Sequence, residues 1–137
     1  MSLAEDRNTP HQDGDLIVVP VATGVKCFAG GIACANAGGF ATPGATAIGL
    51  TYLGRFDDSV DNTTGANGAV DVIVRRKKSF KWKNSGTDPV TQASLGKVCY
   101  IVDDETVAAT AAVVDAAATR SAAGVVVELD ADGVWVE

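Results

Sequence analysis

The feature that most constrains the fold is the regular interruption of short, β-branched runs by turn-forming residues. Glycine pairs such as Gly30-Gly31 and Gly38-Gly39, and the dipeptide Pro43-Gly44, separate these runs. Turn signals at spacings of about 8–12 residues are typical of β-sandwiches and barrels. The sequence predicts strands at Leu16–Val21, Val25–Phe28, Ile32–Asn36, Ala47–Phe56, Ala69–Val74, Ser79–Lys83, Lys97–Val102, Thr106–Thr110, Gly124–Leu129 and Val134–Val136. We therefore expect a mainly β fold: a single compact β-barrel or barrel-like sandwich of short strands, with at most one or two short helical turns.

Two segments carry helical signals. Thr91 stands at an N-cap-like position and Gly96 where the residue after a helix would lie, so we expect a single helical turn between them. Ala111–Ala118 is ambiguous, because alanine favours helices but this segment is short and lacks a clear amphipathic face. The turn-forming residues Asp130–Gly133 join the last two predicted strands into a hairpin.

The chain of 137 residues has room for one domain with a modest core. Its first 14 residues are polar and contain turn signals, so we expect a flexible N-terminal arm at 1–14 and a single domain at 15–137. Hydrophobic residues make up 47% of the chain, but most are Ala or Val, and only 6% of residues are aromatic. Small side chains bury little area each, at roughly 25 cal/mol per Å². Such a core is marginal alone and favours association with copies of itself or with a partner.

The net charge of −6 argues against general nucleic-acid binding, which requires a basic surface that displaces counterions. No basic region followed by an apolar run stands at the start of the chain, so we expect no secretory signal. Residues 27–54 carry no charge, but seven glycines, Pro43 and Asn36 interrupt them. A membrane-spanning helix needs about 20 predominantly apolar residues. We therefore expect turns between short strands in this stretch, and no membrane span.

The three cysteines, Cys27, Cys34 and Cys99, are an odd number without the closely paired spacing of zinc ligands. We expect three small buried thiols, although a disulfide between Cys27 and Cys34 is sterically conceivable. The single histidine, His11, lies in the polar arm, where no rigid frame holds it near a nucleophile.

Acidic residues gather at three predicted turns. They are Asp57, Asp58 and Asp61, then Asp103, Asp104 and Glu105, then Asp130 and Asp132. Aspartate forms turns through its own side-chain hydrogen bonds, and we prefer that interpretation to a structural cation, the alternative for paired carboxylates. The first cluster opens Asp57–Gly68, which predicts a long loop projecting from the body. The glycine-rich region lacks the Gly-Lys-Ser/Thr ending of a phosphate-binding loop. We therefore predict no catalytic, cofactor-binding or metal-binding residue.

The strongest anomaly in this acidic chain is a basic segment. It holds six of the eleven Lys and Arg residues: Arg75, Arg76, Lys77, Lys78, Lys81 and Lys83. Phe80 and Trp82 alternate with Lys81 and Lys83, so we expect a half-buried strand with the rings on one face and the lysines on the other. Three interpretations are open: a solvated strand edge guarded by lysine, a docking patch for acidic protein surfaces including those of sister subunits, and a nucleic-acid patch with aromatic stacking. We take the six basic residues as candidate protein-contact residues.

Turn-plus-strand motifs in the second half of the chain carry a family resemblance. They are Val74-Arg75-Arg76-Lys77, Phe80-Lys81-Trp82, Asp88-Pro89-Val90-Thr91-Gln92-Ala93, Gly96-Lys97-Val98-Cys99-Tyr100-Ile101-Val102-Asp103-Asp104, Thr119-Arg120-Ser121-Ala122-Ala123-Gly124-Val125-Val126 and Asp132-Gly133-Val134-Trp135-Val136. Together they resemble the capsid cement, or head decoration, proteins of tailed bacteriophages. The likeness covers roughly residues 14–137 and is strongest over 74–137. The Asp57–Gly68 loop is less typical of that family.

The resemblance implies a compact β-barrel-like domain on the capsid exterior of the virion, made in the bacterial host cytoplasm. It implies a homotrimer that bridges subunits of the major capsid protein, with no catalytic residue to carry over. Our leading hypothesis is therefore a non-enzymatic structural protein without a cofactor, nucleic-acid or membrane partner, which contacts the shell through its arm or its basic strand. The alternatives are another virion component, such as a tail or head fibre, and an enzyme, small-ligand or cation-binding module with its site in the Asp57–Gly68 loop.

Overall fold

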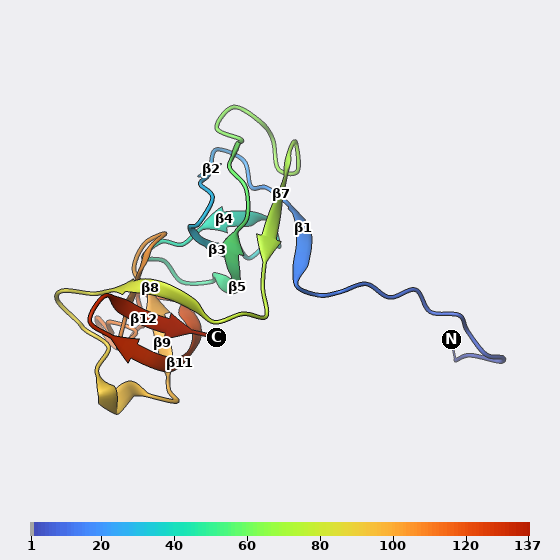
Figure 1. Ribbon diagram of the computed structural model, residues 1–137. Helices are drawn as coiled ribbons and strands as arrows, with labels where there is room; N and C mark the ends of the chain where they lie inside the picture. The colour runs from blue at the N-terminus through green and yellow to red at the C-terminus, as the bar shows by residue number, and fades with distance from the viewer. Residues whose placement is uncertain (1) are drawn as a thin grey trace.

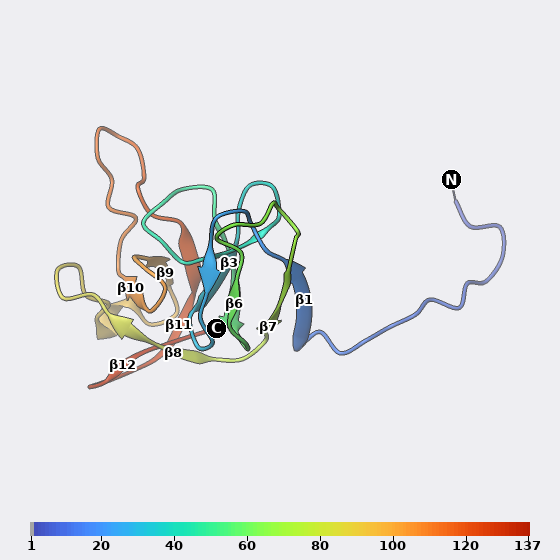
Figure 2. The ribbon, with the colours of Figure 1, turned by 90° about the horizontal axis from the view of Figure 1, so that it is seen from above.

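The computed structural model describes residues 2–137 and confirms the mainly β fold class (Figure 1). The elements are β1 (Leu16–Pro20), β2 (Lys26–Cys27), β3 (Ile32–Ala35), β4 (Ala41–Pro43), β5 (Thr51–Phe56), β6 (Val60–Asp61), β7 (Asp71–Arg75), β8 (Phe80–Asn84), the 3-10 turn η1 (Gln92–Ser94), β9 (Val98–Ile101), β10 (Thr106–Ala108), β11 (Ala122–Asp130) and β12 (Gly133–Val136). Residues 2–13 are all exposed and extend away from the body as an arm (Figures 1 and 2).

Five of the first seven strands form a curled sheet. Its order is β1-β7-β5-β3-β4, and each neighbouring pair is antiparallel. Val21, directly after β1, bridges to Ala41 of β4, so the two outer strands meet and the sheet curls on itself. β2 and β6 pair as a separate short ribbon. The buried side chains of this half form one hydrophobic cluster: Val19, Val21, Cys27, Ala33, Ala41, Phe56, Val72 and Val74.

The C-terminal half closes into a five-stranded barrel of order β10-β8-β12-β11-β9. The β8–β10 pair is parallel, whereas the other neighbours are antiparallel. Along β8, Phe80 and Trp82 are buried while Lys81 and Lys83 are exposed, which confirms the predicted alternation. The predicted barrel is therefore present, and all of its strands come from the chain after residue 79.

β3 joins the two cores because both of its faces are buried. Ile32 and Cys34 pack in the hydrophobic cluster of the barrel, whereas Ala33 between them packs in that of the curled sheet. Side chains alternate between the two faces of a strand, so one short strand closes both cores. Trp82 Nε1 also donates a hydrogen bond of 3.1 Å to Tyr52 Oη, which links β8 to β5.

The segment 57–68 is a loop, as predicted, apart from the two residues of β6. Its fixed point is Asn62, a buried residue whose Nδ2 donates to the carbonyl oxygens of Val21, Ala22 and Ala66 at 3.2, 2.9 and 3.0 Å. Buried carbonyl groups need such partners, because water does not reach them. One amide side chain therefore holds the loop against the end of β1.

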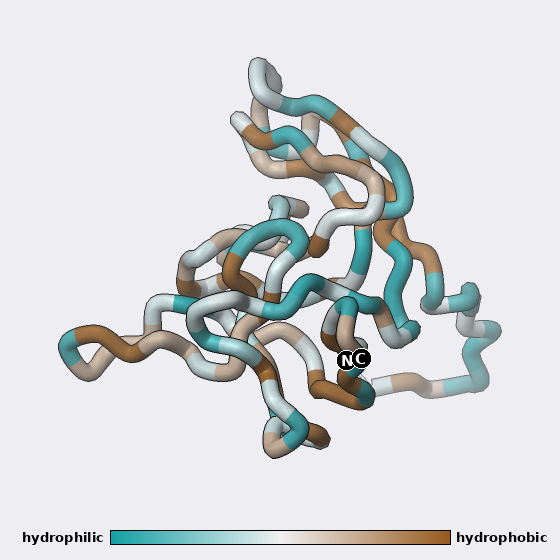
Figure 3. The backbone as a smooth tube through the Cα atoms, turned by 60° about the vertical axis from the view of Figure 1, so that its left-hand side comes forward, coloured by the Kyte–Doolittle hydropathy of each residue, from teal (hydrophilic) through white to brown (hydrophobic). Residues whose placement is uncertain are grey.

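The ambiguous segment Ala111–Ala118 is not helical. Val114 and Ala117 form a bridge, and the turn between them places Asp115 and Ala116 at φ angles of 52° and 62°. Positive φ at both central residues is the geometry of a tight hairpin turn and not of a right-handed helix. The segment projects from the body (Figure 2), and it forms the projection at the left of Figure 3, which carries apolar colouring. Its residues Val113 and Val114 are exposed.

Most of the remaining local predictions are confirmed. The turn η1 forms after Thr91, and Gly96 has a φ of 79°, as expected of a residue that ends a helical turn. All three cysteines are buried free thiols. The strand predicted from Ala47 begins only at Thr51, because Gly49 turns the chain with a φ of 80°. Residues 2–137 form no helix that is long and apolar enough to cross a membrane.

Candidate protein-contact surface

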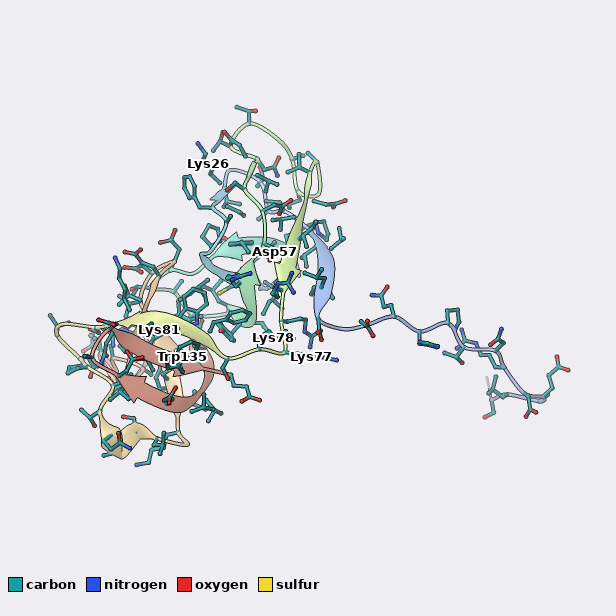
Figure 4. All side chains as sticks on the ribbon, viewed as in Figure 1. Lys26, Asp57, Lys77, Lys78, Lys81 and Trp135 are labelled. Carbon is teal, nitrogen blue, oxygen red and sulfur yellow. The ribbon has the colours of Figure 1, made fainter. Side chains whose placement is uncertain are left out.

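The basic segment begins at the connection between the curled sheet and the barrel. β7 ends at Arg75 and β8 begins at Phe80, so Arg76, Lys77 and Lys78 lie between the two halves (Figure 4). Lys77 has a φ of 62°, which is uncommon for a residue with a side chain and marks the turn of the chain. Residues 75–78 are named the basic corner below.

Arg75 is neutralised within the curled sheet. Its Nε lies 3.0 Å from Asp57 Oδ1, and Arg55 Nη2 lies 2.9 Å from the same oxygen. Hydrogen bonds from Arg75 and then from Arg55 hold the pKa of the Asp57 carboxyl below its ordinary value. The Arg55 guanidinium also lies 5.4 Å from the centre of the Phe80 ring, so this cluster contacts the barrel. Its role is to join the two halves.

The two lysines of β8 are paired as well. Lys81 Nζ lies 3.5 Å from Asp130 Oδ2 and 5.7 Å from the centre of the Trp135 ring (Figure 4). Lys83 Nζ lies 2.7 Å from Glu105 Oε1, and this hydrogen bond raises the pKa of Lys83. Both ammonium groups therefore already have carboxylate partners in their own chain.

The N-terminal arm leaves the body at the basic corner. The Arg76 N–H donates to the carbonyl oxygen of Asp15 at 2.8 Å, and Lys78 Nζ lies 3.3 Å from Asp15 Oδ2. The side chain of Lys77 lies over Gly14, where an added Cβ would collide with it. The structure thus places two predicted contact elements, the arm and part of the basic segment, side by side.

Only part of the predicted contact set is available to a partner. Among residues 2–137, Arg76 and Lys77 have no carboxylate within ion-pair distance, unlike the other four predicted residues. Arg76 is half-buried and Lys77 is exposed. A partner would therefore meet about two uncompensated positive charges here, not six.

The structure changes the three interpretations of the basic segment. β7 lies between β1 and β5, and β8 between β10 and β12, so the strand-edge interpretation is wrong. Phe80 and Trp82 are only 8% and 4% exposed, and their rings pack 5.9 Å apart inside the barrel. Rings in that position cannot stack on bases. A protein-docking patch centred on Arg76 and Lys77 is the interpretation most compatible with these contacts.

The acidic clusters have the turn chemistry that the sequence predicts. Asp61, Asp103 and Asp130 each accept a hydrogen bond from the backbone N–H two residues later, at 2.9, 2.9 and 2.8 Å. In the 57–68 loop the carboxylates do not converge, because Asp57 faces two arginines and Asp58 accepts from the Ile73 N–H at 3.0 Å. Within residues 2–137 no three His, Cys, Asp or Glu side chains are grouped so as to hold a metal ion.

Two surface features were missed at the level of sequence. One is an open hollow of about 320 Å³ between the halves, lined by residues 28–31, Asp104 and Glu105. The other is the projecting hairpin, where Val113 and Val114 are exposed. The Gly30-Gly31 pair is a local signal for the hollow, whereas the alanine-rich hairpin has no turn signature of its own.

Comparison with protein-family models, with curated proteins and with solved structures finds no match for this chain.

Proposed function

We propose that this protein is a non-enzymatic structural component of a tailed bacteriophage that binds the capsid exterior and bridges subunits of the major capsid protein, as a homotrimer. The motifs over residues 74–137 suggest this family, and the barrel agrees with the fold that it implies. The observation that carries the proposal is the arm: residues 2–13 are all exposed, extended and rooted at the basic corner. A compact domain with a long free arm suits a protein that works by contact.

The arm has the reach that bridging requires. Twelve residues span at most roughly 40 Å when fully extended, comparable to the size of a small domain. Ordering the arm on a shell costs conformational entropy, so each contact is modest. Once one copy of a trimer has bound the shell, the other copies bind as intramolecular events, so many weak contacts together give strong binding to the shell. Because these contacts exist only on the assembled shell, they stabilise the assembled state by mass action.

Binding to undecorated capsids of the matching phage tests the proposal. We expect the full chain to cover the capsid surface in fixed stoichiometry, and a variant lacking residues 2–13 to lose this binding. The deletion should leave the circular dichroism spectrum and melting temperature of the body unchanged, because the one side-chain hydrogen bond within residues 2–13 joins Arg7 to Thr9. A variant with the arm residues in shuffled order is the matched control for length and charge.

Full binding by the deletion variant would show that the arm is not the contact. Failure of the full chain to bind any surface of the capsid would overturn the proposed function. Imaging of bound protein separates the nearest alternative, since density on the tail or at a single vertex would assign the chain to a tail or head fibre.

A further inference from the structure

One exposed apolar surface lies on the curled sheet. Leu16 and Val18 of β1 and Ile73 of β7 point outward, and Val18 stands directly opposite Ile73 in the strand register. Val18 is 66% exposed, unusual for a side chain in the middle of a strand. These three residues are named the sheet face. Apolar cross-strand pairs of this kind gain free energy when a partner covers them.

The sheet face ends at uncompensated positive charge. Leu16 pairs with Arg75, and the next position along the chain is Arg76, followed by Lys77 at the corner. Arg75 is neutralised by Asp57, but Arg76 and Lys77 have no carboxylate partner among the described residues. The surface is therefore an apolar stripe with a basic end, and the exposed Asp71, which pairs with Pro20, lies at its other end.

A second apolar surface lies on the outside of the barrel. Val98 of β9 stands opposite Val125 of β11, and Val127 follows in the irregular part of that strand. Leu95 ends the neighbouring η1 turn. These four residues are 38–47% exposed and are named the barrel face.

The barrel face is bordered by uncompensated negative charge. Glu128 follows Val127 and stands opposite Trp135 in the register. Glu137 is held beside Val125 by two backbone hydrogen bonds of 2.9 Å each. Neither carboxylate forms an ion pair within residues 2–137, and both side chains are exposed. The barrel face is thus an apolar stripe with an acidic border at Glu128 and Glu137 and one exposed basic residue, Lys97, next to Val98. Its acidic border is complementary to the basic end of the sheet face.

From this complementarity we propose that the sheet face of one copy docks on the barrel face of a second copy, with Arg76 and Lys77 against Glu128 and Glu137. β1 and β11 lie on different sides of the molecule (Figure 1), so the sheet face and the barrel face of one copy cannot contact each other. The contact joins unlike surfaces, and its repetition gives a closed ring or an open chain. The inference rests on the proposed function only for the number of copies, three, because the contact itself forms without a capsid shell.

Charge reversal tests the contact in solution, by light scattering over a wide range of protein concentrations. We expect the wild-type protein to self-associate and the double variant Arg76→Glu with Lys77→Glu to raise the dissociation constant at least about tenfold. Glu128→Lys with Glu137→Lys should have the same effect. Combining all four substitutions restores opposite charges across the contact and should recover most of the affinity. The control, Arg7→Glu with Lys26→Glu, reverses two charges outside both faces and should leave self-association unchanged.

Two substitutions of exposed apolar residues by aspartate test the apolar part of the contact. Val18→Asp should weaken self-association at least about tenfold, whereas Ile48→Asp, at a side chain that is 68% exposed but outside both faces, should not. A wild-type protein that stays monomeric at every concentration would overturn the inference, as would equal losses in the two aspartate variants or no recovery in the fourfold variant. Capsid binding by the arm is measured separately, so either proposal can fail while the other stands.

Discussion

The amide of Asn62 offers a sharp test of how the long loop is held. Its Nδ2 donates to three carbonyl oxygens at 2.9–3.2 Å in a buried position. The substitution Asn62→Asp keeps the shape of the side chain but replaces this donor with a carboxylate oxygen. The three carbonyl oxygens would then face a carboxylate oxygen, which is also an acceptor, in a buried site. The Nδ2 group carries two hydrogens, so at roughly 1 kcal/mol per lost hydrogen bond the direct loss is about 2 kcal/mol, and desolvation of the charge adds to it.

The size of the loss should depend on pH. The buried site disfavours the charged form, so the carboxyl group introduced by Asn62→Asp should have a pKa above that of an aspartate in the unfolded chain, which is about 3.9. The folded variant then binds a proton more tightly than the unfolded one, and its deficit relative to wild type should grow as pH rises above about 4. Wild-type Asn62 does not titrate, so it contributes no such slope.

The same loop supplies the matched control. Asn67 uses its Oδ1 as an acceptor for the Thr23 N–H at 2.8 Å, so Asn67→Asp keeps the working atom. We expect a change below about 0.5 kcal/mol for that variant. Urea unfolding followed by the fluorescence of the two tryptophans, the buried Trp82 and the half-buried Trp135, measures both free energies. Equal losses in the two variants, or a pH-independent loss at Asn62, would refute the assignment of Nδ2 as the group that fixes the loop.

Three further outcomes are expected. Gly54→Ala should lower the free energy of unfolding by about 3 kcal/mol, because φ is 146° and an added Cβ would collide with a carbonyl of β7. Its control, Gly86→Ala, has open space and no positive φ and should change that free energy by less than about 1 kcal/mol. Chemical denaturation measures both. The three cysteines should react with a thiol reagent at mildly alkaline pH only after unfolding, because burial raises their pKa values to about 11 or 12. Hydrogen bonds from Thr110 and then from Arg120 lower the pKa of Asp88, so the stabilisation is present above the pKa of the unfolded chain and is lost as pH falls through the folded pKa. Asp88→Asn should therefore flatten the loss of stability below about pH 4. Acid titration of the melting temperature tests this.

Local pattern predicted most of the strands, because the signal for a strand lies within its own few residues, but it missed the short strands β4 and β6. The alternation of Phe80 and Trp82 with two lysines predicted which side of β8 is buried. Thr91 and Gly96 predicted the position of the one helical turn among the described residues. Start points were less accurate where a glycine turns the chain, as Gly49 does before β5.

The pairing of distant segments was not predictable in the same way. The strand-edge interpretation failed because the neighbours of β8 are β10 and β12, which follow much later in the chain. Most of the basic segment is neutralised by residues far away in sequence, with separations of 22 residues for Lys83 and 49 for Lys81. No local period encodes such partners. The count of six basic residues in the segment therefore overstated the positive surface that a partner meets.

The double burial of β3 has a consequence for the order of folding during synthesis. Every strand of the curled sheet lies within residues 16–75, so that half leaves the ribosome before the barrel strands are complete. Until the barrel arrives, Ile32 and Cys34 have no core to enter and face water as part of an exposed apolar patch. The nascent chain is then most prone to aggregation in the interval between completion of the sheet and closure of the barrel. Slow translation of residues 80–136 would lengthen that interval.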